Sequence, residues 1–487
     1  MTDPTTRHRP LFREIQFRDP FDVYSVLRAP GSILFESLKG TENIGRYSFI
    51  CMEPYLSFGV KDGNVEVECQ GRKTVSFRKP LQRLKELITA YRQEEVPDLP
   101  PFQGGAAGMF CYDFVRYFEK LPETAVDDLD MPDAHFFMYD RVISFDHKFN
   151  RSWILVCPGA RDTVLGFSEI VRSRDELEAE ASAELDRIER IIASPVNAGN
   201  PADKPLLNPG IVHQTGKEEY MSMVRRAKEY IAAGDIFQAN LSLRLSAEIG
   251  GLDPLRIYAI LRKINPSPFA AYMDAGDYQI VSSSPERLVR VTGSTVDTRP
   301  IAGTRPRGRD TGEDDQMRTE LLLNEKERAE HIMLIDLERN DLGKVSDYGT
   351  VSVDELMTTE QYSHVIHIVS NVQGRLADGM DCFDVIRAAF PGGTITGVPK
   401  VRCMEIIEEL EGRRRGPYTG SLGYIGYNGS MDLNIIIRTF CVKDGKAYVQ
   451  AGAGIVADSD PEREYYESLK KAEALLRTLD RLSIDEG

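Results

Sequence analysis

The chain has 487 residues, of which 41% are hydrophobic and 28% charged, and its formal net charge is −16 at pH 7. This composition is typical of a globular protein with about two or three domains, and the negative charge argues against a general nucleic-acid-binding protein, which would carry a basic surface. No segment reaches the roughly 18 apolar residues of a membrane span, and scattered cysteines without a Cys-x-x-Cys pair favour reduced thiols in a cytoplasmic enzyme.

Short β-rich segments dominate the first 200 residues. Val, Ile, Tyr and Phe recur between Gly, Pro and Asn breaks and predict strands at residues 32–37, 46–51, 55–60, 64–69, 141–147 and 152–157. An amphipathic pattern predicts a helix over residues 80–94, and a charged helix is predicted over residues 173–193. Residues 194–210 are rich in Pro, Gly and Asn, which predicts a linker. We therefore divide the chain into an N-terminal region, 1–205, and a C-terminal region, 213–487.

The C-terminal region combines strand runs with isolated helices. Helices are predicted over residues 217–235 and 319–341 and from Pro461 onward. Strands are predicted at residues 236–245, 269–273, 278–284, 287–293, 420–428, 433–440 and 447–456. Residues 298–308, "TRPIAGTRPRG", are predicted as a stiff loop, because proline removes backbone donors and restricts the residue before it. Without regular βαβ alternation, the pattern predicts an α+β fold with largely antiparallel sheets.

Carboxylates lie on two of the predicted helices. Glu330 stands where a charged surface gives way to an apolar run, and Asp460 with Pro461 is typical of a helix start. Glu467 follows in the next turn, with Lys471 four residues later on the same face. Glutamate oxygens suit Mg²⁺, which takes one or two carboxylates together with substrate and water. Ordinary surface ion pairs are the alternative interpretation.

Arginines and histidines indicate an anionic substrate. Arg438 ends the apolar run "NIIIR" and needs a partner if it is buried, and a carboxylate is its natural bidentate partner. His364 and His367 fall on opposite faces of a predicted strand, and one of them is a candidate general base near neutral pH; a structural histidine is the alternative. Together these residues predict a small, multiply anionic substrate bound with a divalent cation.

A series of ordered motifs carries a resemblance to a known family. The motifs are "GDIFQANLS", "NPSPF", "SSSPERLVRV", "RPIAGTRPRG", "RAEHIMLIDLERNDLGKV", "HIVSNVQG", "GTITGVPK", "MDLNIIIRTF" and "AGAGIVADSDPEREYYESLKKA". The chain resembles the chorismate-utilising enzymes, which include anthranilate synthase component I, aminodeoxychorismate synthase component I, and the isochorismate and salicylate synthases. The resemblance is dense over residues 217–479. It implies an antiparallel sandwich flanked by helices, as in anthranilate synthase component I, and chorismate as the substrate.

The resemblance also implies roles for individual residues. Glu286 matches the general acid that assists loss of the ring hydroxyl, and His367 matches the histidine implicated in eliminating pyruvate. Glu330 and Glu467 match the ligands of Mg²⁺, which bridges the protein and the ring carboxylate. Thr394 lines the matching pocket and is grouped with Glu286 and His367 as a catalytic residue. Contacts to chorismate are implied for Gly303, Thr304, Tyr418, Arg438, Gly452, Ala453, Gly454 and Lys471.

Two positions separate the branches of this family. Water-using members carry a lysine base at the position that resembles Gln238, and glutamine cannot deprotonate water, so ammonia is the implied nucleophile. Aminodeoxychorismate synthases typically carry a nucleophilic lysine where this chain has Ala302. We therefore expect direct amination and anthranilate as the product. Aminodeoxychorismate synthase is the alternative, because "NPSPFAAYM", "GPYTGSLGYI" and "MDLNIIIRTF" look more like that branch.

The resemblance further implies a partner and an effector site. No cysteine lies in a Gly-flanked nucleophile turn, so a separate glutamine amidotransferase subunit is expected to supply ammonia. Ser37 matches a residue of the tryptophan feedback site, whereas Pro268-Phe269-Ala270 replaces the usual Pro-Tyr-Met run, which sets the site apart from a typical tryptophan pocket. A non-enzymatic paralogue that senses chorismate is the alternative from another class, and the intact Glu286 and Glu330 argue against it.

Overall fold

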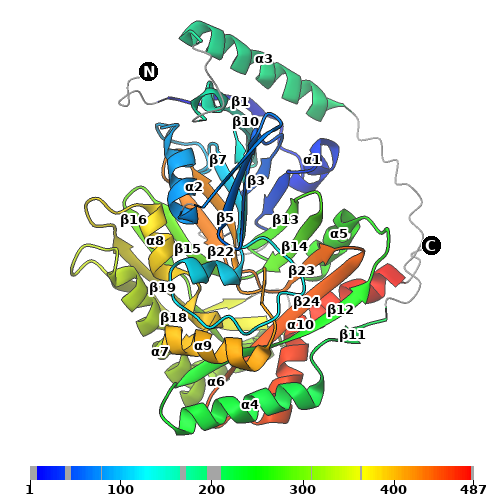
Figure 1. Cartoon of the computed structure of the whole chain (residues 1–487), viewed down its shortest axis with the longest axis vertical. Helices are drawn as coiled ribbons and strands as arrows, with labels where there is room; N and C mark the ends of the chain where they lie inside the picture. The colour runs from blue at the N-terminus through cyan, green and yellow to red at the C-terminus, as the bar shows by residue number, and fades with distance from the viewer. Residues whose placement is uncertain are drawn as a thin grey trace.

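The computed structural model describes residues 8–38, 45–77, 79–164, 172–194, 210–308, 310–361 and 365–483. Two sheets of 12 strands each form its centre, and the strands within them pair antiparallel (Figure 1). The α+β sandwich expected from the sequence is therefore confirmed.

The order of strands shows how distant segments meet. The first sheet runs β1 (Leu11–Ile15), β10 (Arg151–Val156), β9 (Arg141–Asp146), β3 (Tyr47–Cys51), β2 (Ile33–Glu36), β13 (Phe269–Asp274), β14 (Tyr278–Ser284), β23 (Thr439–Lys443), β24 (Lys446–Ile455), β12 (Gln238–Glu248) and β11 (Val212–His213), with β20 (Gly397–Val398) beside β12. The second runs β17 (Ile301–Pro306), β19 (Val365–Arg375), β16 (Thr295–Thr298), β15 (Arg287–Thr292), β22 (Met431–Asn434), β21 (Ser421–Gly426), β7 (Gly105–Phe110), β8 (Ala134–Tyr139), β4 (Leu56–Lys61), β5 (Asn64–Cys69) and β6 (Arg72–Ser76), with β18 (Ser352–Gln361) beside β19.

Helices cover the outer faces of both sheets, with α3 at the top of the view and α4 at the bottom (Figure 1). They are α1 (Pro20–Leu27), α2 (Pro80–Thr89), α3 (Arg174–Ala193), α4 (Lys217–Ala232), α5 (Pro254–Ile264), α6 (Thr311–Leu323), α7 (Glu325–Gly343), α8 (Cys382–Ala389), α9 (Lys400–Glu411) and α10 (Pro461–Ser483), and the short 3-10 turns are η1 (Tyr112–Tyr117), η2 (Ala160–Thr163) and η3 (Gly393–Ile395). None of the described helices is both long and apolar enough to span a membrane.

Both sheets contain strands from both predicted regions. In the first sheet β2 pairs with β13, and in the second β7 pairs with β21. Three large apolar cores follow from this arrangement: one between the two sheets, and one beneath the helices on each outer face. The division at residues 205 and 213 stays a prediction, and the structure joins the two regions through continuous sheets.

Two helix boundaries differ from the expectation. The helix predicted over residues 319–341 is interrupted at Asn324, whose side chain accepts a hydrogen bond from the Glu327 amide at 3.0 Å and so begins α7. Asparagine is a preferred N-cap residue because its side chain satisfies a free amide of the first turn. The helix predicted over residues 80–94 ends at Thr89. The start of α10 at Pro461 agrees with the prediction.

Two strand predictions are also wrong. The segment predicted as a loop contains β17, an edge strand paired with β19 alone. Proline has no backbone N–H to donate, and it is tolerated in an edge strand because that side of the strand has no partner strand to bond with. The single strand predicted over residues 433–440 is two strands, because β22 belongs to the second sheet and β23 to the first. Arg438, with a φ of 51°, lies in the crossover between them.

Candidate active site

Glu286 lies between β14 and β15, where the chain leaves the first sheet for the second. The residue is 6% exposed, and its carbonyl accepts a hydrogen bond from the Ile435 amide at 3.0 Å. Burial raises the pKa of Glu286 to about 7, against the opposing effects of the Thr394 hydroxyl and of the positive charges of Arg438 and Lys471. A buried carboxyl group with this pKa holds a proton near neutral pH, which suits a general acid.

Thr394 lies in η3, a turn packed against α7. Gly393 admits no side chain, because a Cβ there would lie 2.2 Å from Leu337 Cδ2. The carboxyl group of Glu338, on α7, accepts a hydrogen bond from the Gly393 amide, and burial raises the pKa of that carboxyl group. On the other side of the turn the Thr394 hydroxyl faces Glu286. The turn therefore lies between two buried carboxyl groups and is hydrogen-bonded to one of them, that of Glu338.

His367 is positioned by the pairing of β17 with β19. Thr304 lies opposite His367 in this ladder, and Ala302 lies opposite Ile368. His367 Nδ1 is 3.1 Å from the Gly303 carbonyl oxygen, which is an acceptor, so Nδ1 carries the proton and Nε2 the lone pair. Burial lowers the pKa of His367 to about 3, so the imidazole is neutral at pH 7.

Part of the predicted histidine and threonine set lies outside the described structure. The side chain of Thr304 and the whole of His364 fall outside the described residues. Gly303 has a φ of +61°, and a Cβ there would lie 2.9 Å from Leu321 Cδ1. A glycine is needed here because other residues rarely adopt this backbone conformation.

Gln238 begins β12 and faces the glycine-rich end of β24. Its Nε2 donates a hydrogen bond to Glu330 Oε1 at 3.1 Å. A Cβ on Gly454 would lie 2.2 Å from the same nitrogen. Gly452 and Ala453 pair with Ser242 and Leu241 of β12. The sequence "GAGI" therefore provides the space in which the amide of Gln238 reaches α7.

Several buried polar atoms of this cluster have no hydrogen-bond partner among the described residues. They are Gln238 Oε1, Glu286 Oε1 and Thr394 Oγ1. Buried polar groups are almost always paired in folded proteins, so each such atom calls for a ligand or an ordered water. All three belong to residues that the sequence places at the substrate site, and the cluster is our candidate active site.

The carboxylates proposed for a metal ion influence one another. Burial raises the pKa of Glu330, the Gln238 amide opposes this effect, and the negative charge of Glu467 adds to it. Lys471 Nζ lies 3.0 Å from Glu467 Oε1 and donates to the Gly452 carbonyl at 3.1 Å. No three His, Cys, Asp or Glu side chains of the described chain are arranged to hold a metal ion. Two carboxylates are nevertheless enough for Mg²⁺ when substrate and water complete its shell.

Arg438 lies near the cluster, whereas Tyr418 lies beside Arg415. The positive charge of Arg438 acts on both Glu286 and His367. Tyr418 is placed differently, with its ring 5.6 Å from the guanidinium carbon of Arg415.

Sequence reasoning missed two buried charged residues near the site. Glu338 lies on the buried face of α7 with Leu334, Ile335 and Leu342, and a charge within an apolar stripe is the signal that identifies it. Arg415 is fully buried. It was hidden in the run "GRRRG", whose composition is typical of a solvated turn.

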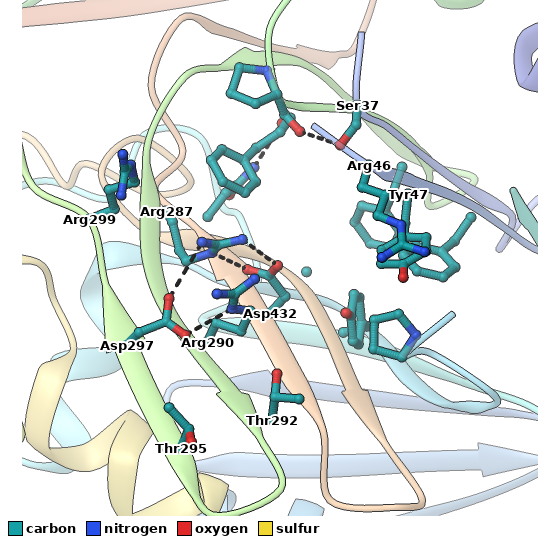
Figure 2. A pocket seen from close by; sticks show the side chains of 18 of the residues that line it. Ser37, Arg46, Tyr47, Arg287, Arg290, Thr292, Thr295, Asp297, Arg299 and Asp432 are labelled. Atoms are coloured by element: carbon teal, nitrogen blue, oxygen red, sulfur yellow. Dashed lines mark hydrogen bonds and ion pairs between the residues drawn. The ribbon is translucent and has the colours of Figure 1, made fainter. Parts of the chain in front are cut away.

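A cavity of about 590 Å³ lies between the two sheets, and its lining residues include Ser37, Pro268, Phe269, Arg287 and Asp432. Ser37 Oγ donates to the Pro268 carbonyl at 2.9 Å, and Arg287 Nε donates to Asp432 Oδ1 at 2.9 Å (Figure 2). The guanidinium carbon of Arg287 lies 5.0 Å from the centre of the Phe269 ring. The three predicted effector residues therefore share one cavity, away from Glu286 and Thr394.

The chain is similar to known proteins over most of its length. Anthranilate synthase component 1 of Thermus thermophilus is 47% identical over 93% of this chain and 93% of that protein. Aminodeoxychorismate synthase component 1 of Bacillus subtilis is 44% identical over 92% of this chain and 91% of that protein. The crystal structure of anthranilate synthase component I from Streptococcus pneumoniae superposes with a TM-score of 0.75 at 36% identity, covering 90% of this chain and 95% of that one.

A model of the family described as chorismate binding enzyme matches residues 32–477. This match covers every strand of the two sheets except β1, and every residue of the candidate active site. The chain therefore belongs to the chorismate-binding enzyme family and is a chorismate-utilising enzyme of the anthranilate synthase and aminodeoxychorismate synthase type.

Proposed function

We propose that the chain is the large subunit of an anthranilate synthase, which converts chorismate and ammonia to anthranilate, pyruvate and water. The observation that carries this proposal is Ala302. It is 8% exposed on β17, next to Gly303, whose carbonyl holds His367. A methyl group at this position offers no amine to attack the ring, so ammonia itself must form the new carbon–nitrogen bond.

Gln238 suits ammonia as the nucleophile. Its Nε2 is committed to Glu330, whereas Oε1 is buried and has no partner among the described residues. An amide oxygen accepts a hydrogen bond from ammonia but cannot remove a proton from water. We expect Gln238 to orient ammonia toward C2 of the ring.

Glu286 and His367 supply the two proton transfers. When ammonia adds at C2, the ring double bonds shift and the C4 hydroxyl leaves with the proton of Glu286, as water. His367 is neutral with its proton on Nδ1, so Nε2 takes the C2 proton while the C3–O bond breaks and the ring becomes aromatic. The departing enolpyruvate takes up a proton to become pyruvate, and the nitrogen added as ammonia releases one, so the protons balance.

Mg²⁺ fits the carboxylates at the opposite edge of the cluster. The negative charge of Glu467 adds to the raised pKa of Glu330, and the positive charge of Lys471, which pairs with Glu467, opposes it. When bound, the ion would neutralise the ring carboxylate of chorismate. The protein's part is to hold the two carboxylates in place, one through Gln238 and one through the first turns of α10.

The ammonia is proposed to come from a glutamine amidotransferase subunit. Relatives of this chain are named component 1, which supports a second component. All seven cysteines of this chain are buried, and burial raises the pKa of the thiols of Cys51, Cys111 and Cys157. A glutaminase nucleophile needs the opposite, an exposed thiol with a lowered pKa.

The experiment that tests the proposed function is product identification. The purified chain is incubated with chorismate, Mg²⁺ and ammonium, and we expect anthranilate and pyruvate in equal amounts. Accumulation of 4-amino-4-deoxychorismate would instead establish the alternative branch, which the Bacillus subtilis relative represents. Binding of chorismate without turnover would establish a sensor. Glutamine without a partner subunit is expected to give no product.

The Gly454→Ala variant is expected to lose activity without losing its fold. The new Cβ would lie 2.2 Å from Gln238 Nε2, so the flexible amide moves away and its bond to Glu330 breaks. We expect kcat/KM for ammonium to fall at least about tenfold, since loss of orientation alone has effects of this size. Gly59→Ala is the matched control, because that strand glycine has no neighbour within 4 Å of an added Cβ. An unchanged kcat/KM for ammonium would show that Gln238 does not orient ammonia.

The Glu467→Gln variant is expected to weaken Mg²⁺ binding. Loss of one of two carboxylate ligands should raise the Kd for Mg²⁺ at least about tenfold, as measured by calorimetry with no turnover. Glu462→Gln is the control, because Glu462 lies on the same helix and pairs with Lys217 at 2.6 Å. Equal Mg²⁺ affinities for the wild type and Glu467→Gln would remove Glu467 from the metal site.

A further inference from the structure

Arg415 follows α9 and is the largest fully buried side chain of the described structure. All five of its N–H groups donate hydrogen bonds within the protein. Nε and one Nη2 hydrogen go to the two oxygens of Glu411 at 2.9 and 2.7 Å. The other Nη2 hydrogen goes to the Asn240 carbonyl at 2.7 Å, and Nη1 donates to the Ile395 carbonyl at 3.0 Å and to Thr419 Oγ1 at 3.2 Å.

Glu411 neutralises this buried charge and is itself fully engaged. The side chains of Arg415 and Glu411 are 1% and 5% exposed. Glu411 Oε1 also accepts from the amide and hydroxyl of Ser242 on β12, at 2.9 and 2.8 Å. Charge-assisted bonds in a dry environment have strict geometry, so the network fixes the positions of the groups that it joins.

Each of the three segments that Arg415 joins carries a residue of the candidate active site or one predicted to contact substrate. The Ile395 carbonyl belongs to η3, directly after Thr394. Thr419 directly follows Tyr418. Asn240 lies two residues after Gln238 on β12 and pairs with Gly454 of β24.

We propose that Arg415 is a positioning residue, which fixes η3, the Tyr418 segment and the start of β12 relative to one another. It does not contact substrate, because every N–H group is already committed to the protein. This inference rests on the proposed function only in that chorismate is the substrate, and it holds for either product.

A purely structural role for Arg415 makes a different prediction from a positioning role. Glu286 faces the Thr394 hydroxyl and the charges of Arg438 and Lys471, and Glu338 lies on the far side of η3. If η3 shifts, the Thr394 hydroxyl no longer lowers the pKa of Glu286, and that pKa rises. Activity that needs protonated Glu286 then extends to higher pH. General loosening of the fold would lower the melting temperature and leave this profile unchanged.

The test compares Arg415→Lys with wild type in the purified full chain. Lysine keeps the charge beside Glu411 but has three N–H donors in place of five. We expect kcat/KM for chorismate to fall at least about tenfold, and the alkaline limb of its pH profile to move upward. Thr394→Val should reproduce the upward shift. If the wild type shows no turnover, the proposed function fails, and a chorismate Kd at least about tenfold weaker in Arg415→Lys still tests the positioning role.

Two further variants keep the inference falsifiable. Arg141→Lys is the control for exchanging a buried arginine, because Arg141 lies on the distant strand β9 and pairs there with Glu53 and Glu184. The melting temperature of this variant should fall while its pH profile stays unchanged. Thr419→Val removes one uncharged link to Arg415 and should lower kcat/KM about threefold; its melting temperature should also fall, because one buried N–H group of Arg415 loses its acceptor. If Arg415→Lys lowers stability as Arg141→Lys does and keeps the wild-type pH profile, or if Thr419→Val is kinetically silent, Arg415 is not a positioning residue.

Discussion

The Glu286→Gln variant is expected to bind chorismate but to have a kcat about 10²–10⁴-fold lower than that of the wild type. A loss of this size is the usual contribution of a general acid. The amide has nearly the same shape as the carboxyl group, so Thr394 keeps its neighbour. The glutamine amide cannot act as an acid, however, so the C4 hydroxyl would have to leave as hydroxide. Single-turnover kinetics with chorismate and ammonium measure the loss, and calorimetry measures the retained affinity.

The pH dependence provides an independent check on Glu286. Burial raises its pKa to about 7, and a general acid is active in its protonated form. The kcat/KM of the wild type should therefore decline as the pH rises above about 7, and Glu286→Gln should lack this decline. Glu408→Gln is the control, because Glu408 is also buried but pairs with Arg116 at 2.6 Å. A wild-type rate in Glu286→Gln would assign the proton transfer to another group.

The Ala302→Lys variant is expected to stop anthranilate formation and to form a covalent adduct with chorismate. Residue 302 is buried beside Gly303, and burial lowers the pKa of a lysine, which leaves a neutral and nucleophilic amine. We expect the anthranilate yield to fall at least about tenfold, with 4-amino-4-deoxychorismate appearing when ammonium is supplied. Product chromatography and intact-protein mass spectrometry measure both effects.

The matched control for this variant is Ala302→Met. Methionine has a similar length but no amine, so it separates loss of space from gain of a nucleophile. Both variants should form less anthranilate, and only Ala302→Lys should gain the mass of a chorismate-derived ring. Wild-type anthranilate formation by Ala302→Lys would show that residue 302 does not face the ring, and the assignment of the product would then need another basis.

The local elements were largely predictable because their signals are local. Pro461 identified the start of α10, and β-branched runs identified most strands. The break at Asn324 was missed because residues that favour helices, leucines before it and Glu, Lys and Arg after it, stand on both sides. Only the hydrogen bond from the Glu327 amide to the Asn324 side chain shows that the helix restarts. The strand at residues 433–440 was predicted as one piece because its pattern is continuous, although the chain changes sheets within it.

The composition of the active site depended on the family resemblance. Glu286 and Thr394 lie on different elements, and no periodicity brings a strand connection to a 3-10 turn more than a hundred residues later in the sequence. Pairing between distant strands is decided by the whole sheet, not by any one segment. Glu338 could be suspected only as an exception within a buried pattern. Arg415 stands in a charged run, and although its partner Glu411 is only four residues away, nothing in the local sequence shows that the pair is buried.

The shared sheets also constrain how this protein is made. A ribosome delivers β2 and β7 early, but their neighbours β13 and β21 are synthesised only with residues 269–274 and 421–426. Until then both strands present unpaired backbone edges, which are templates for misassociation. Both sheets of the N-terminal half can therefore be completed only after residues 421–426 have been synthesised.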